Sequence, residues 1–369
     1  MQFQIPGYTY RDLFDPRRLA GLTELFEEEI HVADPALHAR YMDYRAGRVP
    51  GGVQTSKLLV DLAPRLGGFL ARAFGIEREY AAMKLRAQRD AVIFRVKRDF
   101  FTRRVLKKYG APGLIADDPV SIERRTAQIM AVLPGIPRGD DELELASSVE
   151  LLLSHERFIR VNLPPATLDF LANIRDLLGT WPETGVEPAP GSGDEDRKLF
   201  LASLLSSFEK HLALLYYGNP QKTSGWGLFR IPGQVDYQNL VGSEVSPDPV
   251  PGTHTGDPSH FRRRDGFELT DPRYGLREVE SEVDYCIFCH EREKDSCSRG
   301  FHGDGGYRKN PLGYELKGCP LDQKISESQY LMDGGDALGA LAVIMIDNPM
   351  VPGTGHRICN DCMKSCIYQ

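Results

Sequence analysis

Apolar side chains in the first 217 residues recur with the spacing of amphipathic helices. Residues 56–74 carry such a stripe at Leu58, Leu62, Leu66, Phe69, Leu70 and Phe74. This pattern predicts a helix that is capped by Thr55 or Ser56 and kinked at Pro64. From Ile76 a second stripe runs through Tyr80, Met83, Ala87, Ala91, Phe94, Phe101 and Val105. It predicts a long helix that Gly110 and Pro112 end.

Shorter helices are predicted at 121–133, 141–155, 165–178 and 201–217, with a Pro, Gly and acid-rich linker at 182–197. From residue 218 to residue 280, Gly and Pro recur without a periodic pattern, which is typical of an irregular connector. We therefore expect a mainly α fold with three parts: a helical domain at 1–217, the connector at 218–280, and a helical domain at 281–369.

The composition is that of an ordinary globular chain, with 41% apolar residues and no apolar run of the length that spans a membrane. The N-terminus lacks the basic and apolar segments of a secretory signal, so a cytoplasmic location is expected. A net charge of -7 argues against nucleic acid as the main partner.

All seven cysteines lie after residue 285, at Cys286, Cys289, Cys297, Cys319, Cys359, Cys362 and Cys366. Five of them form one C-x2-C pair and one C-x2-C-x3-C run, which are spacings that let thiolates converge on one ion or cluster. Buried free cysteines are the simplest alternative. Structural zinc is another, because His290, His302 or His356 could supply an eighth ligand for two sites. The Cys319-Pro320 pair favours iron–sulfur clusters.

Three stretches, "CIFCHER", "GCPLDQKISE" and "NPMVPGTGHRICNDCMKSCIYQ", together resemble the iron–sulfur domain of the glutamate synthase small subunit and dihydropyrimidine dehydrogenase. The resemblance covers about residues 280–369. It implies a helical domain with two [4Fe-4S] clusters, one held by Cys286, Cys289, Cys297 and Cys366. Cys319, Cys359 and Cys362 would supply three ligands to the other cluster.

In that family the eighth ligand lies downstream of the last cysteine, so the resemblance implies an N-terminal fragment of a longer enzyme. Electrons would pass from NAD(P)H to FAD in the missing part and then through the clusters to an acceptor. The implied partners are a flavin and NAD(P)-binding domain and an electron-acceptor protein. The chain itself lacks the G-x-G-x-x-G fingerprint after a strand, so no hydride transfer is assigned to it.

The rival function is a zinc-stabilised module that binds a partner without redox chemistry. A candidate docking surface for it is the run from residue 84 to residue 108. This run contains ten Lys and Arg residues and only two acidic residues, Asp90 and Asp99. Such a run is more simply the solvated face of a long helix. His211 is interpreted as a core histidine on the last helix of the 1–217 region.

Overall fold

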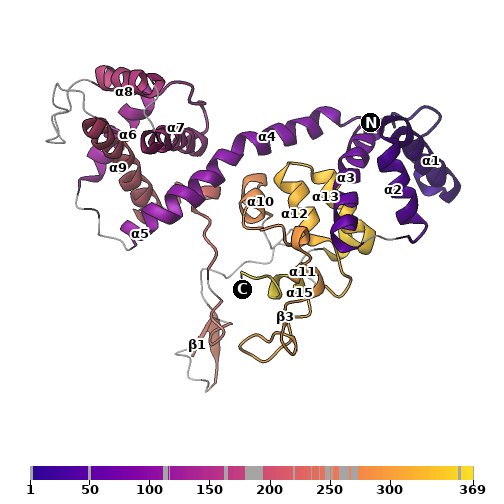
Figure 1. Cartoon of the computed structure of the whole chain (residues 1–369). Coiled ribbons are helices and arrows are strands. Elements are labelled where there is room, and N and C mark those ends of the chain that lie inside the picture. The colour runs from indigo at the N-terminus through magenta and orange to yellow at the C-terminus, as the bar shows by residue number, and fades with distance from the viewer. Residues whose placement is uncertain are drawn as a thin grey trace. The chain divides into compact units, whose positions relative to one another are not determined.

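The mainly α fold is confirmed in a computed structural model (Figure 1). The structure describes residues 3–48, 51–110, 115, 117–161, 165–178, 194–218, 221–233, 235–240, 242–245, 250, 252–256, 266, 273–355 and 359–368. None of the helices in these ranges is both long enough and apolar enough to cross a membrane.

The contacts divide the chain into two compact units that do not follow its order in sequence. Unit 1 contains residues 1–87, 232–274 and 282–369, and unit 2 contains residues 88–231 and 275–281. The first helices of the chain therefore share a unit with the cysteine-bearing residues.

Unit 1 begins with a 3₁₀ turn, η1 (Tyr10–Phe14), and three helices, α1 (Pro16–Ala33), α2 (Pro35–Arg45) and α3 (Gly52–Phe74). Asp15 and Asp34 cap α1 and α2 by accepting backbone N–H groups, as acids before a helix do. The predicted stripe of α3 is confirmed, because Leu58 and Phe69 pack with Phe26, Ile30 and Leu37 from α1 and α2.

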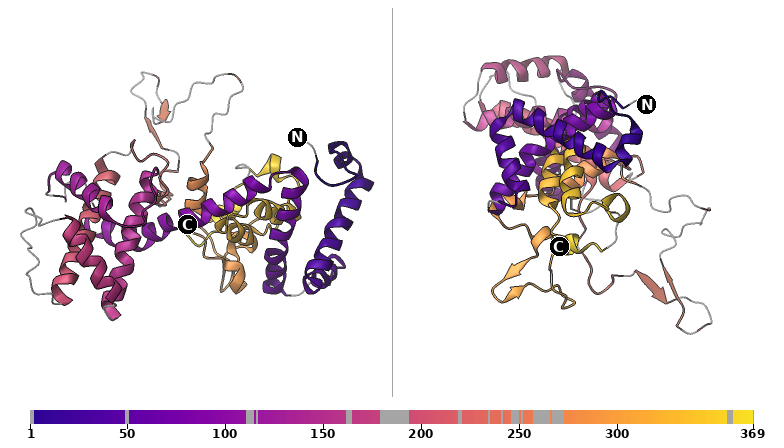
Figure 2. Two further views of the ribbon diagram at one scale, coloured as in Figure 1. Left: turned by 90° about the horizontal axis from the view of Figure 1, so that it is seen from above. Right: turned by 90° about the vertical axis from the view of Figure 1, so that its right-hand side faces the viewer.

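The start of α3 differs from the prediction. Thr55 and Ser56 do not cap the helix; both are buried within it, and α3 begins at Gly52 without a side-chain cap. A second face of α3, at Leu59 and Ala63, packs on α12 (Ile325–Asp333) and α13 (Ala337–Asp347). Figure 2 also shows the purple N-terminal helices beside the yellow C-terminal helices. Local sequence signals could not reveal this contact, because its partner is more than 250 residues away.

The long helix predicted from Ile76 is confirmed as α4 (Glu77–Val96), η2 (Lys97–Val105) and α5 (Leu106–Lys108), which follow one another directly. The middle part, η2, is a π-helix, which periodicity did not predict. Phe100, Phe101 and Val105 of η2 are fully buried. Lys97 is buried too, and its Nζ donates a 2.7 Å hydrogen bond to Ser281.

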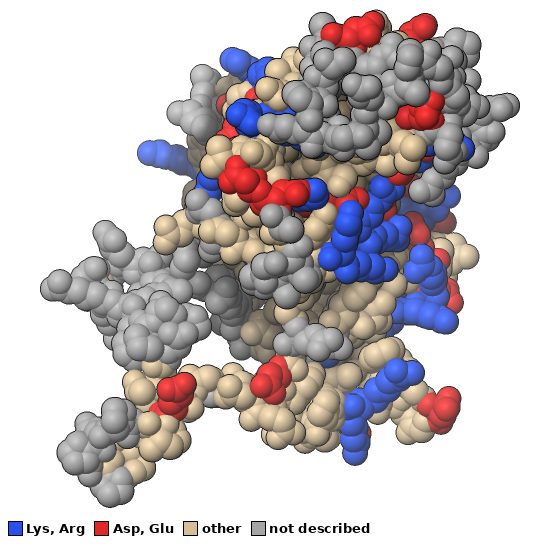
Figure 3. Space-filling model, turned by 90° about the vertical axis from the view of Figure 1, so that its left-hand side faces the viewer, with Lys and Arg blue, Asp and Glu red and all other residues tan. Residues whose placement is uncertain are grey.

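Most of the basic run lies in ion pairs, which fits a solvated helix face. Arg95 lies 3.6 Å from Glu150, and Arg98 and Arg103 lie 3.9 and 3.2 Å from Asp99. Figure 3 shows Lys and Arg side chains gathered on one face with Asp and Glu side chains beside them. Because Lys97 is buried, it cannot belong to an exposed docking surface.

Unit 2 is built from α6 (Pro119–Val132), α7 (Asp141–Val161), α8 (Pro165–Leu178), α9 (Asp194–Gly218) and the 3₁₀ turn η3 (Gly227–Phe229). All four shorter helices are confirmed, but α7 extends to Val161, and α9 begins at Asp194, within the predicted linker. Their apolar faces form one core with η2, centred on Phe101, Val149, Leu152, Leu204 and Phe208. His211, interpreted from the sequence as a core histidine, is half-buried on α9, and burial lowers the pKa of its imidazole. Most of the predicted linker at 182–197 lies outside the described residues.

A buried charge cluster joins α10 (Leu276–Val283) to the rest of unit 2. The Arg277 guanidinium donates hydrogen bonds to Asp90, Asp140 and Glu142 at 2.7–3.1 Å. Glu142 also accepts the N–H of Leu228 at 2.7 Å. Three carboxylates around one guanidinium hold three separate segments of the chain in place.

Short antiparallel pairs occur in the predicted connector and beyond it. Strands β1 (Ser243–Val245) and β2 (His254–Gly256) pair with Glu244 opposite Thr255. The described part of 218–280 otherwise contains η3, the start of α10 and turns. None of these strands belongs to a larger sheet in the described residues.

Candidate thiol site

The cysteines lie in a segment of short helices and tight turns, residues 286–366, which we call the thiol segment. Its elements are η5 (Cys289–Arg292), α11 (Ser296–Arg299), β3 (His302–Gly303), β4 (Gly306–Tyr307), α12, α13, α14 (Val351–Thr354) and α15 (Asp361–Lys364). The second domain was predicted to be helical, and the described part of this segment is helical with one hairpin.

Unusual backbone conformations concentrate in the thiol segment. Among the described residues, the four non-glycine residues with positive φ are Phe288, Glu293, Asp322 and Asn360, and all lie in it. Phe288 directly precedes Cys289, and Asn360 directly follows Cys359. Such conformations are costly and persist where the surrounding structure enforces them, often at functional sites. They turn the chain sharply beside the cysteines.

Residues 298–318 form a hairpin that brings its two ends together. β3 pairs with β4, and Lys309 bridges Glu315. At the base, the Cys319 N–H donates a 2.9 Å hydrogen bond to the Cys297 carbonyl. Gly318 approaches so closely that a Cβ added to it would lie 2.4 Å from the backbone N of Gly300. A backbone hydrogen bond thus joins Cys297 and Cys319, although 22 positions separate them in the sequence.

The C-terminal cysteines reach the same place through α15. Ser365 is buried, and its hydroxyl accepts a 2.9 Å hydrogen bond from the N–H of Gly318. α15 also packs on α11, the helix that carries Cys297. No motif in the sequence marks Ser365 or Gly318.

Four thiols interact with one another through space, and we call them the first thiol set: Cys286, Cys289, Cys297 and Cys366. Burial raises the pKa of the Cys286 thiol, and the neighbouring thiols of Cys289 and Cys366 add to the increase. Burial likewise raises the pKa of Cys297, with a large contribution from Asp295. The resemblance implied this grouping of four cysteines.

Cys319, Cys359 and Cys362 form the second thiol set. Burial raises the pKa of Cys362, and the Cys319 and Cys359 thiols contribute in the same direction. Cys319 is buried, whereas Cys359 is exposed. This set contains three thiols, one fewer than a [4Fe-4S] cluster takes from cysteine.

The thiols are near one another but are not arranged as a coordination sphere. Within the described residues, no three His, Cys, Asp or Glu side chains stand close enough together to hold a metal ion. The expected metal-binding groups are therefore not assembled in this arrangement of side chains. No reaction step can be derived through an iron–sulfur cluster here.

Asp295 is a neighbour of the first thiol set that sequence reasoning missed. Its Oδ1 accepts the S–H of Cys297 at 3.0 Å, and its carboxyl group is buried. Burial raises the pKa of Asp295. A thiol beside a buried carboxylate stays protonated, so Cys297 is a poor nucleophile unless a cation replaces the proton.

The histidines considered as zinc ligands are used otherwise or are not placed. His290 is buried, and its Nδ1 lies 2.7 Å from the Ser326 hydroxyl. His302 is exposed, and its Nε2 lies 3.1 Å from the Arg299 carbonyl. His356 lies outside the described residues.

Comparisons with known proteins point to a different group of proteins from the one that the cysteine motifs suggested. Residues 3–75 match the family described as the RP005 N-terminal alpha-helical domain. The chain is 26% identical over 322 residues to the uncharacterized protein RP005 of Rickettsia prowazekii (strain Madrid E), covering 85% of this chain and 92% of that protein. No solved structure matches.

These findings correct the family interpretation. The identification with the glutamate synthase type of iron–sulfur domain is wrong, because the family found is the RP005 helical domain and no iron–sulfur domain was found. The assignment as an oxidoreductase rested on the same resemblance and is also wrong. FAD, NAD(P)H, the flavin-domain partner and the electron acceptor rested on that resemblance alone. What remains is a helical chain similar to an uncharacterized relative, with seven cysteines in two sets.

Proposed function

We propose that this protein is a helical partner-binding module whose thiol segment is stabilised by one zinc ion bound to the first thiol set. The observation that carries the proposal is the proximity of four thiols from the two ends of the segment, Cys286, Cys289, Cys297 and Cys366. Four cysteine thiolates are a complete ligand set for structural zinc.

Zinc would compensate for the cost of this arrangement. Burial raises the pKa values of Cys286, Cys289 and Cys297, so without a cation these three thiols are neutral. Zinc binding displaces the thiol protons and makes metal affinity depend on pH. Closing the coordination sphere requires rotation of cysteine side chains, because the thiols are not positioned around a common point.

The second thiol set supports partner binding rather than a second zinc site. It offers three thiols, and exposed apolar side chains lie in the same stretches of sequence: Leu321, Met350, Met363, Ile367 and Tyr368. Exposed methionine and aromatic side chains are typical of protein-binding surfaces. We therefore propose a partner with an apolar contact surface.

Metal analysis of the purified full chain tests the zinc site. We expect about one zinc per chain, in line with one four-cysteine site, and no acid-labile sulfide. Cys366→Ser should remove the zinc, and Cys359→Ser, a matched change outside the first thiol set, should retain it. Iron with acid-labile sulfide, or no bound metal, would overturn the proposal.

Site-specific photo-crosslinking in cells tests the partner surface. A photoreactive side chain at position 368 should give a discrete crosslinked product. The same group at position 14 is the control, because Tyr368 and Phe14 are both exposed aromatic residues. Equal crosslinking patterns at the two positions would contradict a binding surface near the second thiol set.

A further inference from the structure

The N-terminal helices and the thiol segment share one hydrophobic core. Leu59 and Ala63 of α3 pack against Leu331 of α12 and Ala340 and Val343 of α13. The α13 sequence, ALGALAVIMID, has a single charged residue, Asp347. A helix with apolar residues all round needs cover on more than one face. α3 covers one face of α13 and α12 covers another.

Two buried polar links fix this contact. The Ser56 hydroxyl of α3 donates a 2.5 Å hydrogen bond to Oε1 of Glu327, and both side chains are buried. The Tyr80 hydroxyl of α4 donates a 2.6 Å hydrogen bond to Oδ1 of Asp336. The same Asp336 oxygen caps α13 by accepting the N–H of Gly339 at 2.9 Å. The start of α13 is thus bound to α4 through its capping residue.

Close backbone approach adds a steric requirement. Gly335 has φ +74°, and a Cβ added there would lie 2.8 Å from Cα of Lys84. Gly67 of α3 faces the same place, since an added Cβ would meet the Tyr80 hydroxyl at 2.4 Å. Glycine at these two positions lets the helices approach closely enough for the Tyr80 hydrogen bond.

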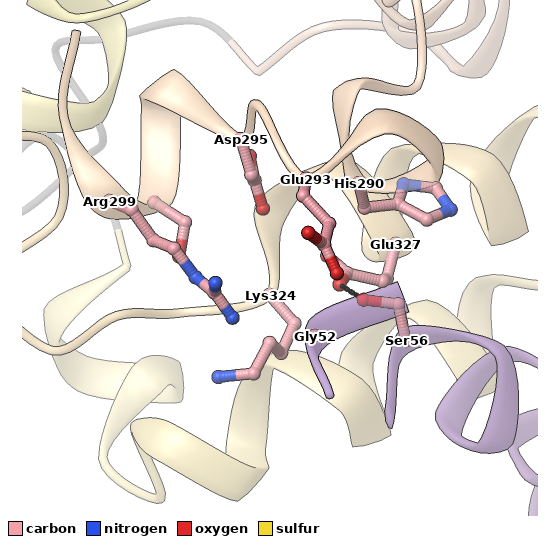
Figure 4. A pocket seen from close by; sticks show the side chains of 9 residues that line it. Gly52, Ser56, His290, Glu293, Asp295, Arg299, Lys324 and Glu327 are labelled. Atoms are coloured by element: carbon pink, nitrogen blue, oxygen red, sulfur yellow. Dashed lines mark hydrogen bonds between the residues drawn. The ribbon is translucent and has the colours of Figure 1, made fainter. Parts of the chain in front are cut away.

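Next to this contact, α3 and the cysteine-bearing turns enclose a small polar pocket (Figure 4). It has room for about one water molecule. Ser56 lies on one side, with Glu327 bonded to it, and Asp295, which holds the Cys297 thiol, lies on another. Oε2 of Glu327 is buried and has no hydrogen-bond partner among the described residues. The pocket lies between α3 and the support of the first thiol set.

We infer that the N-terminal helices are the template that positions the thiols. The positioning residues are Ser56 and Tyr80 in those helices and Gly335 on the side that they contact. α12 and α13 lie in sequence between Cys319 and Cys359, so their placement decides where α15 and Cys366 return to meet Cys297. α3 and α4 supply the surface that holds α12 and α13. This assigns a role to the region that matches the RP005 N-terminal helical domain, and it deepens the proposed function.

Thiol reactivity in the full chain tests the template. Each cysteine is alkylated under native conditions with a zinc chelator present, and the rate is read by mass spectrometry. Gly335→Ala should raise the rates at Cys297 and Cys366 at least tenfold, because the added methyl group pushes α4 away from α13. Gly47→Ala is the matched control: Gly47 has φ +76° in the same unit, but nothing lies within 4 Å of its added Cβ.

A second pair of substitutions, at Ser56, tests the inference if the Gly335→Ala variant does not fold. Ser56→Ala should raise the rates at Cys297 and Cys366 several-fold, and Ser56→Thr, which keeps the hydroxyl, should restore most of the protection. Ser148→Ala is the control, since Ser148 is as fully buried but donates within its own helix in unit 2. Unchanged rates in Ser56→Ala, or equal changes in the two alanine variants, would overturn the inference.

The alkylation experiment does not depend on zinc. If the chain binds no metal but Gly335→Ala and Ser56→Ala expose the thiols, the template inference stands and the proposed zinc site fails. If zinc is bound in every variant with unchanged thiol rates, the zinc site stands and the template inference fails.

Discussion

The hydroxyl of Tyr80 donates a 2.6 Å hydrogen bond to Oδ1 of Asp336, a residue 256 positions further along the chain. Both side chains are buried, and Asp336 also caps α13. Burial raises the pKa of Tyr80, and its hydrogen bond with Asp336 adds to the increase, so the hydroxyl remains a donor at every physiological pH. One side chain therefore links the N-terminal helices to the thiol segment.

Tyr80→Phe should destabilise unit 1, because it removes a donor and leaves the Asp336 carboxylate with fewer partners. The expected loss is about 1–3 kcal/mol, the usual cost of an unsatisfied buried polar group. Hydrogen exchange of α13 amides would report it. Tyr314→Phe, at an exposed tyrosine of the hairpin, should change the exchange rates little. Equal exchange in the two variants would contradict the role given to the Tyr80 hydroxyl.

Arg277→Met should destabilise unit 2 more strongly. It would leave Asp90, Asp140 and Glu142 without the guanidinium that they share. Removing one partner of a buried charge group costs about 3–5 kcal/mol. The loss should appear as faster hydrogen exchange in α7 and α10. The control is Arg103→Met, because the Arg103–Asp99 pair is exposed and contributes at most about 1 kcal/mol.

The stability of unit 2 should fall as the pH rises through 7. Burial raises the pKa of Glu142 to about 7 from the usual 4.5, although the Leu228 N–H and Arg277 oppose the increase. A raised folded pKa stabilises the fold below pH 4.5, and that contribution is lost as the pH rises through 7. The total change is at most about 3 kcal/mol.

The pKa of Asp140 is shifted in the opposite direction, so Asp140 affects the stability of unit 2 in a lower pH range. The Arg277 hydrogen bond lowers its pKa, so its contribution is lost only as the pH falls below the usual Asp range. Urea unfolding of unit 2 between pH 4 and pH 8, followed by hydrogen exchange, measures the Glu142 effect. Glu142→Gln should flatten the fall in stability between about pH 4.5 and about pH 7. A profile with the same slope in this variant would show that another group titrates there.

Cys286→Ser and Cys366→Ser should have the same effect on metal binding, although 80 positions separate the two residues. Both thiols belong to the first thiol set and interact through space. We expect each change to lower the zinc content to near zero and the double change to lower it no further. Cys362→Ser, in the second thiol set, should leave zinc in place. Partial and additive losses would indicate separate local sites.

The amino-acid sequence by itself determined the local structure of this protein. The apolar period of 3.6 residues placed the bodies of α3, α4 and α6 to α9, because that period depends only on which face of each helix is buried. The C-x2-C spacing marked the C-terminal segment as the candidate site, which stays a prediction. The motif resemblance, however, led to a family that the comparisons do not support.

Only the tertiary structure decided which segments share a core. Ser56 reads as a helix cap in the sequence, but it is a buried donor to Glu327, because α12 and α13 cover that face of α3. The sequence predicts Lys97 to be a surface charge in the basic run, but its side chain is buried and hydrogen-bonded to Ser281. Gly335 carries no motif, but it lies against Lys84 of α4. For these three residues the decisive neighbour is far away in sequence, and periodicity records that a face is buried without recording what buries it.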